Sequence, residues 1–236
     1  MSRPETPHHE SLNGDQRGAM SYLLGPSGFE RWDKGIMPLE FTPPLGITTI
    51  LPVLRRRSLE SGREWGVQFV WDRGTSALVR TLDHSGTEEE TYTQSKIKEW
   101  QLRTTQTPVV DLHTHPATFN KENPNNYARN QFPSQEDIDI LSQEHHILAS
   151  IVAGEQGYSC VLKQAQFLEG TLSLPETPPY SRIDEVANNA KLEVVGNQLA
   201  IHVGTAFGVY HTFSSASYDF RYIARKNRSN RSHQRA

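Results

Sequence analysis

Short apolar runs alternate along the chain with segments in which apolar residues recur at helical spacing. Strands are predicted for the hairpin 64–83 around the turn Asp72-Arg73-Gly74, for 107–115, and for the pair 147–154 and 157–164. Helices are predicted at 134–146, at 182–204 and, although Pro52 weakens the pattern, at 47–61. This mixed order predicts an α+β fold in which helices flank a curved mixed β-sheet.

The two ends of the chain differ in pattern from the middle. Residues 1–20 are polar, carry Pro and Gly and show no apolar period, so we expect a disordered N-terminal arm. Residues 21–46 mix aromatic residues with Gly and Pro and predict an irregular segment packed on the core. Residues 166–223 are expected to form a C-terminal extension with the long helix, and 224–236 a basic disordered tail.

Composition limits the classes of protein to which the chain can belong. Its 236 residues fit one domain, and the net charge of -3 gives no global attraction to nucleic acid or to anionic membranes. The single cysteine, Cys160, rules out an internal disulfide and is predicted to be a core residue. We find no membrane-length apolar run and no secretion signal, so a cytoplasmic protein is expected.

Two histidines, His113 and His115, stand at the end of the predicted strand 107–115. Alternate residues of a strand point to the same face, so the two imidazoles lie side by side and Thr114 points away. That spacing suits a small cation, although a catalytic zinc usually takes three protein ligands. An isolated pair of this kind is equally well explained as two ordinary polar residues. Other candidate ligands must therefore decide whether the pair belongs to a metal site.

Two further groups supply candidate partners. Ser134 stands at the predicted N-cap of a helix, with Asp137 in its first turn, where the helix dipole favours an anion. A plain capping box explains these two residues equally well. Glu64 directly precedes the first strand, and a carboxylate there is suited to act as the general base of a metal-dependent hydrolase.

Taken together, Glu64, then His113-Thr114-His115-Pro116, then Ser134-x-x-Asp137 resemble the motif of the JAMM (MPN-plus) zinc metalloproteases. The likeness covers roughly residues 47–165. It implies that His113, His115 and Asp137 bind Zn²⁺, that Glu64 activates the water, and that Ser134 helps to hold the oxyanion.

The same resemblance implies a fold and a reaction. The fold would be MPN-like, with a layering similar to that of cytidine deaminases. The reaction would be hydrolysis of an amide or isopeptide bond in a protein or peptide substrate, with ubiquitin-like proteins as one candidate class. No sequence feature identifies the substrate or decides the oligomeric state.

The chain departs from the family pattern in two places. The 17 residues 117–133 separate Pro116 from Ser134, which is more than the family spacing and indicates an inserted loop. We expect this loop, with Tyr127, Arg129 and Phe132, to contact substrate, and an unstructured spacer is the alternative. Family members often continue E-x-x-G into the strand, so Glu60 competes with Glu64; Glu64 is preferred because it abuts the strand.

Other classes of protein begin with the same histidine motif or keep the same fold. Amidohydrolase and phosphoesterase barrels need about 250 residues, whereas only 121 of the 236 residues follow His115. A non-catalytic MPN-type scaffold that binds a partner protein is the other alternative, and it would not need paired histidines. His145 and His146 end a predicted helix, where the dipole favours a cation, and His202 and His211 lack a carboxylate at motif spacing, so all four are predicted to be structural.

Overall fold

The computed structural model describes residues 12–81, 84–85, 104–115, 129–175, 192–212, 214 and 216–225. Its helices are α1 (Gly14–Asp33), α2 (Leu45–Ser61), α4 (Gln135–Gln143), α5 (Ala165–Leu168), α7 (Leu192–His202) and the 3-10 helix η3 (Arg129–Gln131). Its strands are β1 (Glu40–Phe41), β2 (Trp65–Asp72), β3 (Ala77–Arg80), β4 (His84–Ser85), β5 (Gln106–Thr114), β6 (Ala149–Ala153), β7 (Tyr158–Lys163), β8 (Phe207–His211) and β9 (Phe220–Tyr222). The predicted α+β class is confirmed.

All the strands belong to one open mixed sheet in the order β1-β9-β8-β7-β6-β5-β2-β3, with β4 paired to β2. β5 and β6 run parallel, and every other described pair is antiparallel. A parallel pair needs a crossover connection, and α4 lies in that connection. An open sheet with one parallel pair excludes the closed parallel barrel considered above.

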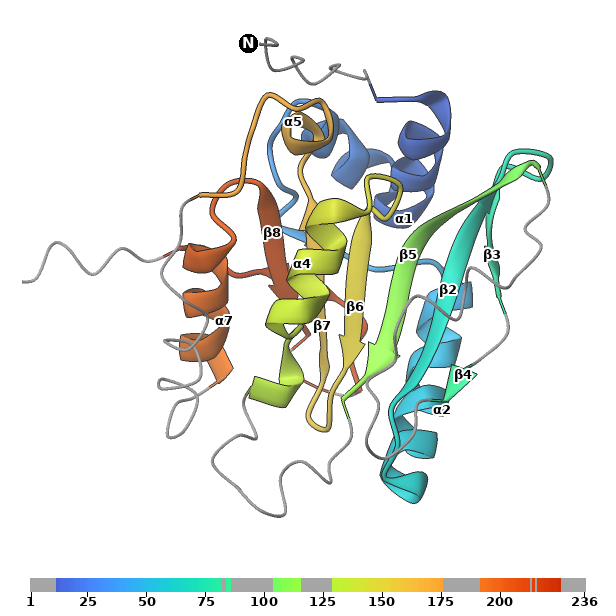
Figure 1. The fold of residues 1–236 in the computed structure, drawn as a ribbon, viewed down its shortest axis with the longest axis vertical. Coiled ribbons are helices and arrows are strands. Elements are labelled where there is room, and N and C mark those ends of the chain that lie inside the picture. The colour runs from blue at the N-terminus through green and yellow to red at the C-terminus, as the bar shows by residue number, and fades with distance from the viewer. Residues whose placement is uncertain are drawn as a thin grey trace, which may run out of the picture.

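Helices cover both faces of the sheet (Figure 1). α1 and α2 pack on one face, where Val110 and Leu112 of β5 point, and form the larger apolar core. α4 and α7 cover the other face, where they bury Val161 and Val209 in a second core. Because side chains alternate along a strand, His113 of β5 points toward the α4 side.

The predictions of a disordered arm at 1–20 and of an irregular segment at 21–46 were wrong for the residues that form α1. Asn13 caps it by accepting a hydrogen bond from the backbone N–H of Gln16, whose side chain bonds back to Asn13 in a capping box. Pro26 is tolerated because Gly25, at φ 69°, interrupts the helical backbone just before it. The residues that α1 buries are Ala19, Met20, Leu23, Leu24, Gly28 and Trp32.

Most of the other predicted elements are confirmed. These are the helices α2 and α4, the strand β5, and the hairpins β2–β3 and β6–β7. α7 confirms part of the long helix, while residues 1–11, 182–191 and 226–236 lie outside the described part of the chain. β1, β8 and β9 were not predicted. Among the described helices, none is both long and apolar enough to cross a membrane.

Lys163 is buried at the end of β7, where hydrogen bonds link it to α1 and to the end of α4. Its Nζ donates a hydrogen bond to the backbone carbonyl of Glu144, the C-cap residue of α4, at 2.7 Å. The Lys163 carbonyl in turn accepts a hydrogen bond from the Trp32 indole at 2.7 Å. Burial lowers the pKa of Lys163 to about 7, against a partial opposing effect of Glu144.

The lowered pKa of Lys163 predicts a pH-dependent stability. Between about pH 7 and pH 10.5 the Lys163 amine is protonated in a larger fraction of unfolded chains than of folded ones. The free energy of unfolding should therefore rise with pH across that window, by at most about 1.4 kcal/mol per pH unit. Urea unfolding of the wild type and of Lys163→Met at pH 7.5 and pH 9 measures this effect. The prediction would be contradicted if the difference in the free energy of unfolding between the wild type and Lys163→Met were the same at both pH values.

Candidate metal centre

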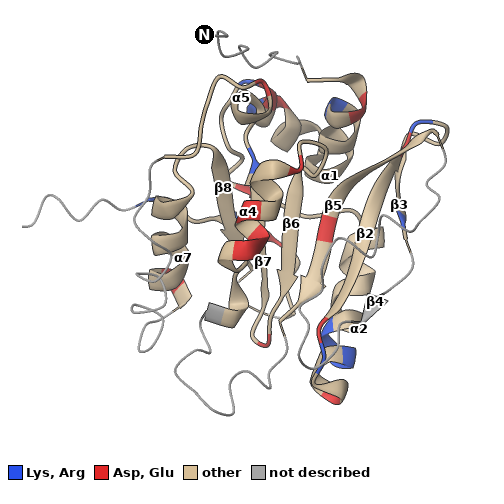
Figure 2. Cartoon of the chain, viewed as in Figure 1, with Lys and Arg blue, Asp and Glu red and all other residues tan. Residues whose placement is uncertain are grey.

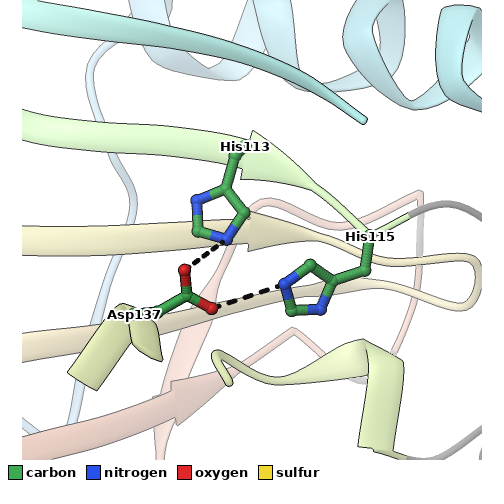
Figure 3. Close-up of side chains that lie close together, drawn as sticks. All are labelled: His113, His115 and Asp137. Carbon is green, nitrogen blue, oxygen red and sulfur yellow. Dashed lines mark ion pairs between the residues drawn. The ribbon is translucent and has the colours of Figure 1, made fainter. Parts of the chain in front are cut away.

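Three side chains converge at the C-terminal end of β5 (Figure 3). His113 Nε2 lies 3.3 Å from Asp137 Oδ1, and His115 Nε2 lies 3.4 Å from Asp137 Oδ2. One ligand atom from each residue lies within 4.8 Å of the other two, and no other described group of His, Cys, Asp and Glu side chains meets this condition. Two imidazole nitrogens and one carboxylate oxygen at this separation could hold a metal ion.

The two histidines are held by the centre of the sheet. His113 is paired with Gly66 of β2 on one side and with Val152 of β6 on the other, and its side chain is 1% exposed. His115 follows the last residue of β5, and its side chain is 16% exposed. The site is therefore buried at His113 and partly exposed at His115.

Asp137 is positioned by the first turn of α4. The Ser134 backbone N–H and hydroxyl both donate to Asp137 Oδ2, at 2.6 Å and 2.7 Å, and the Asp137 N–H donates to Ser134 Oγ at 3.2 Å. The predicted capping box is thus confirmed. Because Oδ2 already accepts two hydrogen bonds, Oδ1, which faces His113, is the oxygen better placed to bind a cation.

Asp111 is a member of this cluster that the sequence analysis missed. Its Oδ2 lies 3.1 Å from Nδ1 of His113, on the side of the ring away from Asp137, and the residue is 5% exposed. The signal was present in the sequence, because Asp111 precedes His113 by two strand positions and must share its face.

The charges of the cluster favour a cation. Burial lowers the pKa of His113, but the nearby carboxylates of Asp137 and Asp111 outweigh it and raise that pKa well above its usual value. Burial likewise raises the pKa of Asp137, and the two histidines outweigh it and hold that pKa well below its usual value. α4 adds acidic side chains and no basic ones to this side of the sheet (Figure 2).

The strand register carries Glu64 toward the same site. Glu64 is buried and directly precedes β2, whose Gly66 is paired with His113. Extending that register by two residues sets Glu64 opposite His115, on the face that carries the imidazoles. The backbone N–H of Trp65 donates to Thr114 Oγ1 at 2.8 Å, which fastens this end of β2 to β5.

Glu60, the competitor of Glu64, lies elsewhere. It belongs to α2, which covers the opposite face of the sheet, and its side chain is 69% exposed. Its nearest ion-pair partner is Arg56, one helical turn earlier, at 4.0 Å. These positions favour Glu64 as the carboxylate of the site.

The described end of the segment 117–133 is anchored to the fold. The fully buried Gln131 accepts a hydrogen bond from the Gln156 backbone N–H at 2.8 Å. Phe132 is 1% exposed and packs in the core beside α7, with its ring centroid 5.3 Å from that of His211. The prediction that Phe132 contacts substrate is therefore wrong. Pro116, Tyr127 and the Arg129 side chain lie outside the described part of the chain.

Two further residues named in the sequence analysis, Cys160 and His211, are structural. Cys160 is buried in β7, and burial raises the pKa of its thiol, which confirms it as a core residue rather than a nucleophile. His211 is also buried, and burial lowers its pKa to about 4, so it is neutral in the folded protein near pH 7. Neither belongs to the metal cluster.

Comparisons with family models, with curated proteins and with solved structures found no match for this chain. A function must therefore be inferred from the side chains of the cluster themselves.

The geometry predicts that metal binding depends on each of the three ligands. His115→Ala and Asp137→Asn should each remove most of the zinc that the wild type takes up, because two donors hold the ion far more weakly than three. Metal analysis after dialysis against zinc measures the content. His145→Ala is the matched control, since His145 is an exposed histidine beyond the other end of α4. Equal zinc content in His115→Ala and the wild type would overturn the site.

Proposed function

We propose that the chain is a JAMM-type zinc metallopeptidase or isopeptidase that hydrolyses an amide or isopeptide bond in a protein or peptide substrate. The observation that carries the proposal is the convergence of His113, His115 and Asp137 from a strand end and a helix start. The open mixed sheet with helices on both faces supports the MPN-like, deaminase-like layering that the sequence motif implies.

The donor set suits zinc. Two imidazoles and one carboxylate are the three protein ligands found in many catalytic zinc sites, and they leave a position for water or substrate. When bound there, zinc would lower the pKa of water to about 7 and polarise the scissile carbonyl. The partly exposed His115 side of the cluster is where a substrate would approach.

Glu64 would move the proton in this reaction. A carboxylate buried at the strand entrance is positioned more firmly than one on a surface helix. Its Oε atoms would accept a proton from the attacking water and return it to the departing amine. The hydrogen bond from Trp65 N–H to Thr114 Oγ1 would hold Glu64 beside the histidine strand during this transfer.

Ser134 would serve two roles in sequence. Its single hydroxyl hydrogen is donated to Asp137 Oδ2, so in this state it orients a ligand. To stabilise the oxyanion of the tetrahedral intermediate, the hydroxyl would exchange that acceptor for the substrate oxygen. The backbone N–H of Ser134 would keep its own hydrogen bond to Asp137 meanwhile.

A non-catalytic MPN-type scaffold is the second candidate function. What counts against it is the buried charge of the cluster, because a scaffold would gain stability from apolar residues at those positions. A protein that binds zinc but cleaves no peptide or isopeptide would favour the scaffold.

Glu64→Gln should abolish cleavage without removing zinc. Loss of a general base typically slows a reaction by about 10² to 10⁴-fold. Zinc content and the rate of cleavage of a panel of peptide and ubiquitin-like isopeptide substrates are measured together. Glu60→Gln is the matched control, because Glu60 is exposed on the far side of the sheet. If Glu64→Gln cleaves as fast as the wild type, the base is misassigned.

Variants at Ser134 separate the cap from the oxyanion role. Ser134→Ala should lower the free energy of unfolding by about 1 kcal/mol, whereas Ser134→Gly should lower it by only a few tenths of a kcal/mol, because Gly is well tolerated at an N-cap. Both variants lack the hydroxyl donor and should slow cleavage by about 10² to 10³-fold, the usual loss for one oxyanion donor. Chemical unfolding and the cleavage rate are the two measurements. Wild-type cleavage in Ser134→Gly would show that only the cap matters.

A further inference from the structure

Asp111 lies behind the metal cluster, and neither the family motif nor the proposed mechanism gives it a role. We propose that Asp111 is the positioning residue that fixes the ring orientation and the tautomer of His113 for metal binding. This inference rests on the metal site of the proposed function and adds to it a residue that does not touch the ion.

The first support is the geometry of the His113 ring. Asp111 Oδ2 lies 3.1 Å from Nδ1, and Asp137 Oδ1 lies 3.3 Å from Nε2. The ring is therefore held between two carboxylates at its two nitrogens. A hydrogen on Nδ1 that is donated to Asp111 leaves the lone pair of Nε2 directed toward Asp137 and His115, where the ion would lie.

The second support is the cost of placing Asp111 there. The residue is 5% exposed in the centre of the sheet, and a buried carboxylate is unfavourable unless it is paired. Within the described part of the chain, its ion-pair partner is His113, and no Lys or Arg approaches it. An apolar residue would serve the fold better at this position, so the carboxylate is explained by the histidine that it contacts.

The third support is the row of side chains around Asp111. Gln68 of β2 and Ser150 of β6 stand directly opposite Asp111 on its two neighbouring strands. Asp111 Oδ1, Gln68 Oε1 and Ser150 Oγ are buried and make no hydrogen bond within the described residues. Farther along the same row, β7 and β8 carry Val161 and Val209. From β2 to β8, the polar side chains of this row thus lie on β5, which carries His113, and on its two neighbours β2 and β6.

Zinc titration of the metal-free full chain tests the proposal. A competing chelator gives the dissociation constants of the wild type, Asp111→Ala and Asp111→Asn. Asp111→Ala should bind zinc about 10 to 100-fold more weakly, the usual effect of removing a partner of a ligating histidine. Asp111→Asn should lose less, because its amide oxygen can still accept the Nδ1 hydrogen. Asp139→Asn is the control for charge, since it removes an exposed carboxylate two residues after Asp137 and should bind zinc like the wild type.

A second readout separates positioning from a structural role. Cobalt is bound in place of zinc, and its visible absorption reports the geometry of the ligands. Asp111→Ala should change this spectrum and Asp111→Asn should restore it, while urea unfolding of the metal-free proteins checks that both fold. Wild-type zinc affinity and spectrum in Asp111→Ala would overturn the role of Asp111 and leave the metal site standing. Absence of zinc binding in the wild type itself would instead overturn the proposed function.

Discussion

The parallel pairing of β5 with β6 is the constraint on which the candidate site depends. Parallel neighbours cannot be joined by a tight turn, so the chain must cross back over the sheet, and α4 is part of that crossing. The crossing sets the start of α4 near the end of β5, so the first helical turn faces the last strand residues. The helix dipole favours an anion in that turn. Asp137 therefore serves both as part of the helix cap and as the carboxylate beside the two imidazoles.

The long stretch of chain between His115 and Ser134 shows why spacing along the sequence is a weak guide to spacing in the fold. Extra length in a loop costs little conformational entropy, provided that its ends are fixed. Here the far end is fixed by two side chains that fit against glycines. A Cβ on Gly154 would lie 2.3 Å from Gln131 Oε1, and one on Gly196 would lie 2.9 Å from Phe132 Cζ. Close packing at these two points, rather than a short connection, brings Ser134 and Asp137 to the histidines.

The sequence predicted the elements that carry the site better than those that surround it. β5 and α4 have strong local signals, an apolar run and a capping box, and both proved correct. α1 was missed because its first residues are polar without an apolar period and because Gly and Pro residues, among them Gly25 and Pro26, indicated irregular chain, whereas the helix only kinks there. β8 and β9 are short, and their pairing partners are set by the sheet rather than by local pattern. Asp111 was overlooked because an acid before a histidine is unremarkable until strand alternation places both on one buried face.

The buried Lys163 and the buried charges of the metal cluster have different physical explanations. Lys163 is satisfied by the backbone carbonyl at the end of α4, and burial shifts its pKa toward the neutral form, as expected of a group that serves the fold. In the metal cluster the pKa shifts run the other way, because burial is outweighed by the carboxylates around His113, which raise its pKa, and by the two histidines, which lower the pKa of Asp137. Replacing such a buried ionic group by apolar residues commonly stabilises a protein. A cluster of carboxylates and imidazoles beside the partly exposed His115 is therefore better explained by the binding of a cation than by any need of the sheet.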